Sequence, residues 1–204
     1  MTSDFELLDA WAEGDKEAAR ELVERHFASL YRFFRNKVSD GADDLVQDTL
    51  LATLQARARF RRDASFRTFL FQTARYVLSG HFRKRGRSPI DFASASAVDL
   101  SPSPSAIVVH DAEQRLLLEA MRRLSLDHQI VLELFYWEEL KGPQLAEALE
   151  ITEAAMRSRL HRARQELRSN LEVIAKSSDV LASTWTNLET WARSLRDRIH
   201  RDPA

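Results

Sequence analysis

The stretch ITEAAMRSRLHRARQELRSNL, Ile151 to Leu171, predicts a long amphipathic helix and with it the architecture of the second half of the chain. Its apolar residues recur at the helical period of about 3.6 positions, which brings them to one side. The expected buried stripe consists of Met156, Leu160, Ala163 and Leu167. The opposite side carries Arg157, Ser158, His161, Arg162 and Gln165. These polar residues form either a solvated surface or a surface that binds a polyanion.

The residues before this helix favour binding. Gly142 and Pro143 are typical of a helix start, since glycine tolerates the cap position and proline suits the first turn. The short helix that they begin ends near Leu149, and the Thr152 hydroxyl can cap the next helix. A short helix, a brief turn and a longer helix with basic residues in its first half predict a helix-turn-helix that enters the major groove of DNA.

The composition favours an all-α protein that is not an enzyme. Only five residues are Gly and five are Pro among 204, whereas 44% are hydrophobic, so helices around a core are expected. The six histidines show no metal-ligand spacing, no glycine-rich phosphate loop occurs, and cysteine is absent. We therefore expect no metal and no cofactor. The acidic start lacks a signal peptide and no apolar run reaches the roughly 18 residues of a membrane span, so we expect a cytoplasmic protein without such a span.

A basic segment runs from Arg57 to Arg87. It has nine Arg and one Lys against one Asp, although the whole chain has a formal net charge of −1. A helix is expected over residues 66–84, and its aromatic side chains mostly follow the spacing of a core. The polar side of this helix is the better candidate for contact with nucleic acid. That side carries Thr68, Gln72, Arg75, Ser79 and Arg83.

The preceding helix, expected over residues 43–59, has the opposite charge. One side is apolar, and another carries Asp44, Gln47, Asp48 and the apolar Leu51. Because carboxylates repel phosphates, this side is either solvated surface or a docking site for a basic helix of a protein partner. Helices over residues 5–38, with a break at 12–15, complete the first block.

A change in composition separates this block from the next. Ser88 to Ala106 contains three of the five prolines and no Lys or Arg, which is typical of a flexible linker. We therefore expect helical domains over residues 1–87 and 109–171, a linker over 88–108 and a helical extension over 172–204.

Three segments resemble the extracytoplasmic-function (ECF) group of the sigma-70 family. They are ADDLVQDTLLATL, FRRDASFRTFLFQTAR and ITEAAMRSRLHRARQELR. The stretch from Phe5 to Phe34 is also similar to the start of these proteins. The resemblance covers roughly residues 5–87 and 111–171, and it implies a σ2 helical bundle and a σ4 helix-turn-helix domain. The implied function is that of an alternative sigma factor, which binds core RNA polymerase and directs it to promoter DNA.

The resemblance also implies roles for individual residues. Asp44, Gln47, Asp48 and Leu51 lie in the segment that docks on the clamp helices of the polymerase β′ subunit, and the β subunit is a further contact. Arg61, Arg62, Asp63 and Ser65 lie in the loop that captures a flipped base of the −10 element, and the polar side from Thr68 to Arg83 meets the same element. Arg157, Ser158, His161 and Arg162 match positions that contact the −35 element.

Four positions depart from the family pattern, and one of them is Lys141, near which the family usually has Ser or Thr. Phe69 stands where the family often has Trp, and Tyr76 and Gly80 stand where it often has Asn and Asp. The latter two keep an alternative open, namely a sigma-like helix-turn-helix regulator that binds DNA without opening promoters. A conventional repressor would explain neither the basic segment nor the acidic side.

The extension continues past the usual end of the family with an apolar stripe at helical spacing. The stripe consists of Leu181, Trp185, Leu188, Ala192, Leu195 and Ile199. It fits a helix that packs on the second domain, or a regulatory tail that acts in place of or beside an anti-sigma factor. Contact with a membrane surface or with DNA is the third interpretation, because Arg193, Arg196, Arg198 and Arg201 accompany the stripe.

Overall fold

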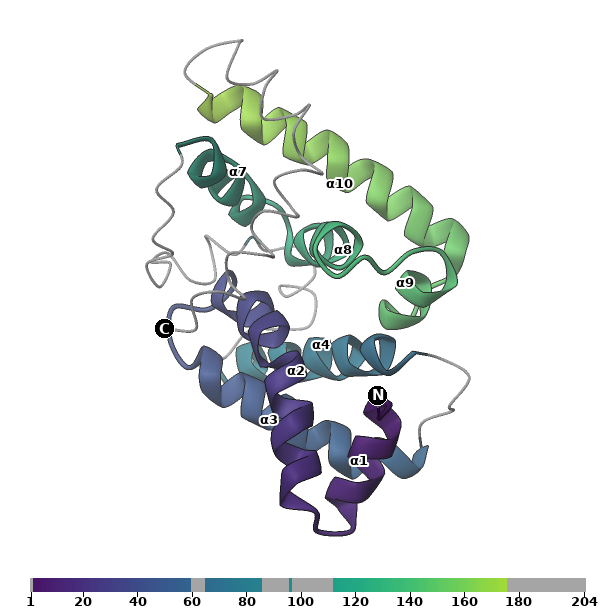
Figure 1. The fold of residues 1–204 in the computed structure, drawn as a ribbon. Helices are drawn as coiled ribbons and strands as arrows, with labels where there is room; N and C mark the ends of the chain where they lie inside the picture. The colour runs from purple at the N-terminus through teal and green to yellow at the C-terminus, as the bar shows by residue number, and fades with distance from the viewer. Residues whose placement is uncertain (1, 60–64, 86–95, 97–111, 176–204) are drawn as a thin grey trace.

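The computed structural model describes residues 2–59, 65–85, 96 and 112–175 of the chain. Its helices form two groups, which Figure 1 shows one above the other. The first group contains α1 (Asp4–Ala12), α2 (Lys16–Arg35), α3 (Ala42–Ala56), the short 3-10 helix η1 (Arg57–Arg59) and α4 (Phe66–Lys84). The second contains α7 (Ala112–Arg122), α8 (Leu126–Tyr136), α9 (Pro143–Ala148) and α10 (Glu153–Ile174). The all-α prediction is confirmed, since extended pairing within the described residues is limited to a bridge between Ser96 and Ser125.

Capping side chains fix the starts of the first two helices. Ser3 and Glu6 form a reciprocal capping box, in which the Ser3 N–H donates to Glu6 Oε2 at 2.7 Å and the Glu6 N–H donates to Ser3 Oγ at 3.3 Å. Asp15 Oδ1 accepts from the N–H groups of Glu17 and Ala18 at 2.8 and 3.1 Å. Such caps each stabilise a helix by about 1 kcal/mol. The predicted break at residues 12–15 is therefore the turn between α1 and α2.

The first group packs as a helical bundle around one core. Helix α2 contacts α1 and α3, and α3 also contacts α4. The core includes Leu8, Leu22, Leu30, Phe34, Leu70, Phe71 and Leu78, each no more than 1% exposed. Removing a side chain of this size from water stabilises the fold by about 1.5–3 kcal/mol. The prediction that the aromatic residues of the basic segment are mostly core is confirmed for Phe66, Phe69, Phe71 and Phe82, whereas Tyr76 is 55% exposed.

The second group is built on α10, which packs against α7, α8 and α9. The predicted stripe is confirmed, because Met156, Leu160, Ala163 and Leu167 are at most 8% exposed. Thr152 Oγ1 accepts from the Ala155 N–H at 3.2 Å, as predicted. Gly142 caps α9 at a φ of +54°, a value that glycine adopts without the strain of a Cβ atom. Helix α10 continues to Ile174, past the expected domain end at residue 171.

The two groups also contact each other, mainly where α9 lies against α4 (Figure 1). The expected linker, apart from Ser96, and the apolar stripe of the extension lie outside the described residues. Within the described part of the chain, no helix is long and apolar enough to cross a membrane, and no cluster of His, Cys, Asp or Glu could hold a metal ion.

Candidate nucleic-acid interface

The first half of α10 presents a polar surface to solvent. The structure brings Arg157, Ser158, His161 and Arg162 together on this side, all exposed and opposite the buried stripe. We call these four residues the α10 surface. The Arg157 guanidinium lies 3.3 Å from Glu153 Oε2, and Arg162 Nε donates to the Ser158 carbonyl at 3.4 Å. Such exposed contacts contribute little to stability, so the guanidiniums can exchange them for phosphates or base edges.

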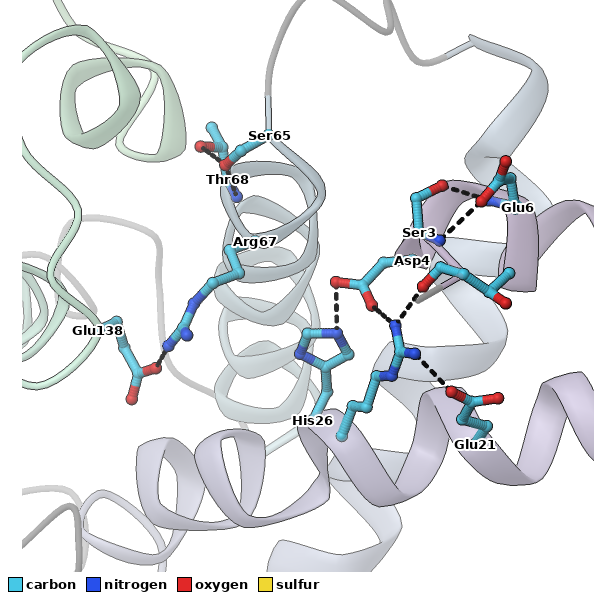
Figure 2. Close-up of polar contacts among 11 residues, drawn as sticks. Ser3, Asp4, Glu6, Glu21, His26, Ser65, Arg67, Thr68 and Glu138 are labelled. Atoms are coloured by element: carbon cyan, nitrogen blue, oxygen red, sulfur yellow. Dashed lines mark hydrogen bonds and ion pairs between the residues drawn. The ribbon is translucent and has the colours of Figure 1, made fainter.

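The polar side of α4 is less accessible than the sequence predicts. We call Ser65, Gln72, Arg75, Ser79 and Arg83 the α4 surface. The placement of Thr68 on an exposed side is wrong, because its side chain is fully buried. Ser65 caps α4 by accepting from the Thr68 N–H at 3.1 Å, and the two hydroxyls are hydrogen-bonded at 2.8 Å (Figure 2). Arg83 is exposed, Gln72 and Ser79 are partly buried, and Arg61, Arg62 and Asp63 lie outside the described residues.

Arg75 and Tyr76 on α4 contact the turn between α9 and α10. Arg75 Nη1 donates to the Ala148 carbonyl at 2.8 Å and lies 3.9 Å from Glu150 Oε2. The Tyr76 hydroxyl donates to Glu150 Oε1. Burial lowers the pKa of the Arg75 guanidinium, and the carboxylates of Asp127 and Glu150 oppose that effect. In this arrangement the turn therefore occupies the central part of the α4 surface.

Two buried glutamates connect the groups at a second place. Glu138, just after α8, accepts from Arg67 Nη2 of α4, as Figure 2 shows. It also accepts from Arg32 Nη2 of α2 at 2.5 Å. Glu133 of α8 accepts from Lys37 Nζ and from Asn36 Nδ2, the latter at 3.0 Å. The Lys37 side chain is 0% exposed and those of Glu133 and Glu138 are 5% and 3% exposed. The contact between the groups is therefore ionic as well as closely packed.

Neither glutamate is predicted from the sequence, although the sequence holds one signal for Glu133. Glu133 interrupts the apolar run IVLELFYW, residues 130–137. A carboxylate within an apolar helix needs a buried partner. The partner lies 96 positions away in the sequence, so the charge alone could not identify Lys37.

The outer side of α3 carries a different kind of surface. Asp44, Gln47 and Asp48 are exposed, and the Leu51 side chain next to them is 44% exposed. We call these four residues the α3 surface. The predicted exposure of Leu51 beside two carboxylates is confirmed. A cationic partner helix can pair with the carboxylates and cover the leucine, whereas nucleic acid would be repelled.

Comparisons with known proteins agree on one family. A family model described as Sigma-70 region 2 matches residues 22–88, and one described as Sigma-70, region 4 matches residues 114–167. The ECF RNA polymerase sigma factor SigL of Mycobacterium tuberculosis is 32% identical over 158 residues, which cover 75% of this chain and 88% of SigL. The probable RNA polymerase sigma factor RfaY of Xanthomonas campestris is 34% identical over 135 residues. These residues cover 64% of this chain but only 34% of the length of RfaY.

Solved structures show the same architecture. The sigma factor RpoE of Bartonella quintana, in complex with the anti-sigma factor NepR, has a TM-score of 0.58 and 26% identity, over 78% of this chain and 99% of the RpoE chain. CnrH in complex with the cytosolic domain of CnrY has a TM-score of 0.61 over 85% of this chain and 100% of the CnrH chain. At 24% identity, the likeness to CnrH supports the fold alone.

Proposed function

Because this chain belongs to the ECF group of the sigma-70 family and is an alternative RNA polymerase sigma factor, we propose that three of its surfaces bind the polymerase and the two promoter elements. The α3 surface docks on the polymerase, the α4 surface binds the −10 element and the α10 surface binds the −35 element. The domains over residues 1–87 and 109–171 and the linker over 88–108 belong to the same proposal.

The observation that carries the proposal is the exposure of the α10 surface on the helix that follows a capped turn. Arg157 and Arg162 lie five residues apart, and their side chains project from the same polar side. An arginine can donate two hydrogen bonds to a guanine edge, and each such contact contributes about 1–3 kcal/mol of discrimination. Ser158 and His161 add shorter side chains that reach bases or phosphates.

The α3 surface suits the polymerase rather than the promoter. Asp44 and Asp48 are one helical turn apart, with Leu51 beside them. A basic partner helix, as expected for the β′ clamp, neutralises both carboxylates and removes the leucine from water. Burying such a leucine contributes about 1.5–3 kcal/mol.

The α4 surface and the preceding loop suit an unstacked base. Arg61 and Arg62 supply positive charge for the backbone, while Asp63 and Ser65 supply short polar groups for the base edge. Flipping a base costs a few kcal/mol, which contacts from this loop must offset. Arg75 and Arg83 extend the positive charge along the helix toward the neighbouring phosphates.

The proposed function also includes the place where the chain acts and two sources of regulation. We expect the chain to act in the cytoplasm, where promoters and polymerase lie, as a binding factor rather than as an enzyme. An anti-sigma factor is a further partner, because the similar RpoE is bound by one, NepR. The extension over residues 172–204 acts beside that partner or in its place.

The test separates the polymerase surface from the DNA surfaces. Asp44→Lys is expected to prevent the chain from co-purifying with core RNA polymerase, whereas Arg157→Ala is expected to leave this binding intact. Asp43→Lys is the matched control, because Asp43 is exposed on the same helix outside the α3 surface. The proposal fails if Asp44→Lys and Asp43→Lys bind polymerase equally well.

A further inference from the structure

Helix α4 carries an exposed aromatic side chain, that of Tyr76. This residue is 55% exposed, whereas every phenylalanine of the same helix is buried, with at most 6% of the residue exposed. The Tyr76 hydroxyl donates to Glu150, and this contact involves only the outer end of the side chain. A single exposed aromatic residue is common on protein surfaces and does not by itself indicate a binding site. The role of the ring therefore depends on what lies next to it on the helix.

Gly80 lies one helical turn after Tyr76, on the same side of α4. Glycine is less favourable than alanine inside a helix, because it loses more conformational freedom on folding. The φ of Gly80 is not positive, so the backbone does not require glycine here. A Cβ atom at this position would meet only the side chain of Arg83, at 4.0 Å, so no neighbouring element of the described structure requires it either. Gly80 thus leaves open space one turn from the Tyr76 ring without a reason in packing.

Positive charge borders the open space at Gly80. Arg83 is exposed, and its Nη2 atom is the side-chain atom nearest to that space. Because the helix repeats about every 3.6 residues, positions 76, 80 and 83 fall on one side. The segment from Arg57 to Arg87 around them has nine Arg and one Lys against one Asp. An exposed ring, an open surface and a cation in a row suit a base that stacks on the ring while its phosphate meets the guanidinium.

We propose that Tyr76 and Gly80 form a stacking platform for one unpaired base of the −10 element, with Arg83 at the neighbouring phosphate. The platform stands where the family often has Asn and Asp. An amide or a carboxylate reads the hydrogen-bonding edge of a base, whereas a ring contacts its flat face. This chain therefore depends on the presence of a base at that position more than on its identity. The proposal rests on the proposed function, because it assumes that α4 binds the −10 element.

The test measures how tightly the complex of core polymerase and the full chain binds a DNA probe with an unpaired −10 element. The probe is taken from the promoter upstream of the chain's own gene. Tyr76→Ala is expected to weaken binding by about tenfold, a usual loss for one stacked base. Tyr76→Phe also loses the contact with Glu150 but keeps the ring, so it is expected to retain most of the affinity. Equal losses in the two variants would overturn the proposal.

Abasic sites then locate the stacked base. Each position of the −10 element in the probe is replaced in turn by an abasic site. At one position the parent chain and Tyr76→Ala are expected to bind equally well, and a difference that persists at every position would count against the platform. With each of the four bases at that position, binding should be tighter than with the abasic site, because every base has a flat face. If three of the bases bind as weakly as the abasic site, a hydrogen-bonded edge carries the contact and the proposal is wrong.

Gly80→Leu tests the open space beside the ring. Leucine favours a helix and its Cβ atom has room at this position, so the variant should melt no lower than the parent chain. The leucine side chain is expected to obstruct the base and to weaken binding to the intact probe. Val173→Ala is the control for a changed apolar side chain on the surface, because Val173 is 74% exposed near the end of α10. If Gly80→Leu binds the probe as tightly as this control, the glycine does not serve a base and the platform is refuted.

Two comparisons separate the stacking platform from the proposed function. Tyr76→Ala is expected to bind core polymerase without DNA as tightly as the parent chain does, and a loss there would assign the ring to the polymerase instead. A probe with a scrambled −10 element measures the binding that does not depend on this element. If the parent complex binds both probes equally, the proposed −10 contact and the platform fail together. If it prefers the intact probe but Tyr76→Ala and Tyr76→Phe bind alike, only the platform fails.

Discussion

Replacing Glu133 by glutamine is expected to destabilise the protein by about 3–5 kcal/mol, the usual cost of leaving a buried charge without its partner. The Lys37 ammonium is fully buried and donates to Glu133 and to the Phe33 carbonyl, the latter at 2.6 Å. Asn36 and Gln129 also donate to the same carboxylate, at 3.0 and 2.9 Å. Glutamine nearly preserves the size of the side chain. The decrease in the free energy of unfolding therefore reports the missing charge rather than a cavity.

The pH dependence of this variant has a defined sign. Burial lowers the pKa of Lys37 below its ordinary value of 10.5, and the Glu133 carboxylate opposes that effect. Between the lowered pKa and 10.5, the unfolded chain binds more protons than the folded chain, so stability rises with pH. Without the carboxylate the pKa falls further. The stability of Glu133→Gln should therefore rise with pH over a wider range than that of the parent chain.

Urea unfolding at pH 7, followed by circular dichroism and tryptophan fluorescence, measures the loss. The deciding comparison adds Lys37→Met, which removes the unpaired charge. The free energy of unfolding of the double variant is expected to exceed that of Glu133→Gln alone by about 2 kcal/mol, because a buried charge without a partner is removed. If Lys37→Met instead destabilises the Glu133→Gln protein further, an unpaired Lys37 charge is not the cause of the loss.

Three other changes have defined outcomes. Arg157→Ala should weaken promoter binding by the polymerase complex by about 1–3 kcal/mol, with an unchanged melting temperature, as measured by a binding titration at fixed salt. Thr152→Ala should cost about 1 kcal/mol in urea unfolding, because the Ala155 N–H loses its cap, whereas Thr152→Ser should retain most of the stability. Burial, with Arg85 nearby, lowers the pKa of His81 below 6.5, so the unfolded chain takes up a proton first as the pH falls. The melting temperature should therefore fall from pH 7 to pH 5, and the fall should be smaller in His81→Gln.

Periodicity predicted the individual helices well. The sequence-based bounds of the helix over 66–84 match α4, because Ser65 provides a cap and the apolar residues repeat without a break. The stripe on α10 was predicted for the same reason, since each of its residues faces neighbouring helices in the structure. Capping and amphipathicity are local properties, and the sequence displays them directly.

The contact between the two helical groups could not be predicted in this way. On a helical wheel Thr68 and Arg75 look like solvated residues, but one is buried and the other meets the turn after α9. The glutamate that pairs with Arg32 lies 106 positions away, so no periodic pattern links the two. Charged side chains usually indicate surface, and only the tertiary arrangement shows which of them are buried as pairs.

In vitro transcription measures directly whether this chain acts as a sigma factor. The assay combines bacterial core RNA polymerase, the purified full chain and a promoter from upstream of its own gene. We expect transcripts from a defined start that depend on the chain, and we expect Asp44→Lys to abolish them and Arg157→Ala to reduce them. Specific binding of the chain to the same duplex without polymerase, together with no transcript when polymerase is present, would contradict this role.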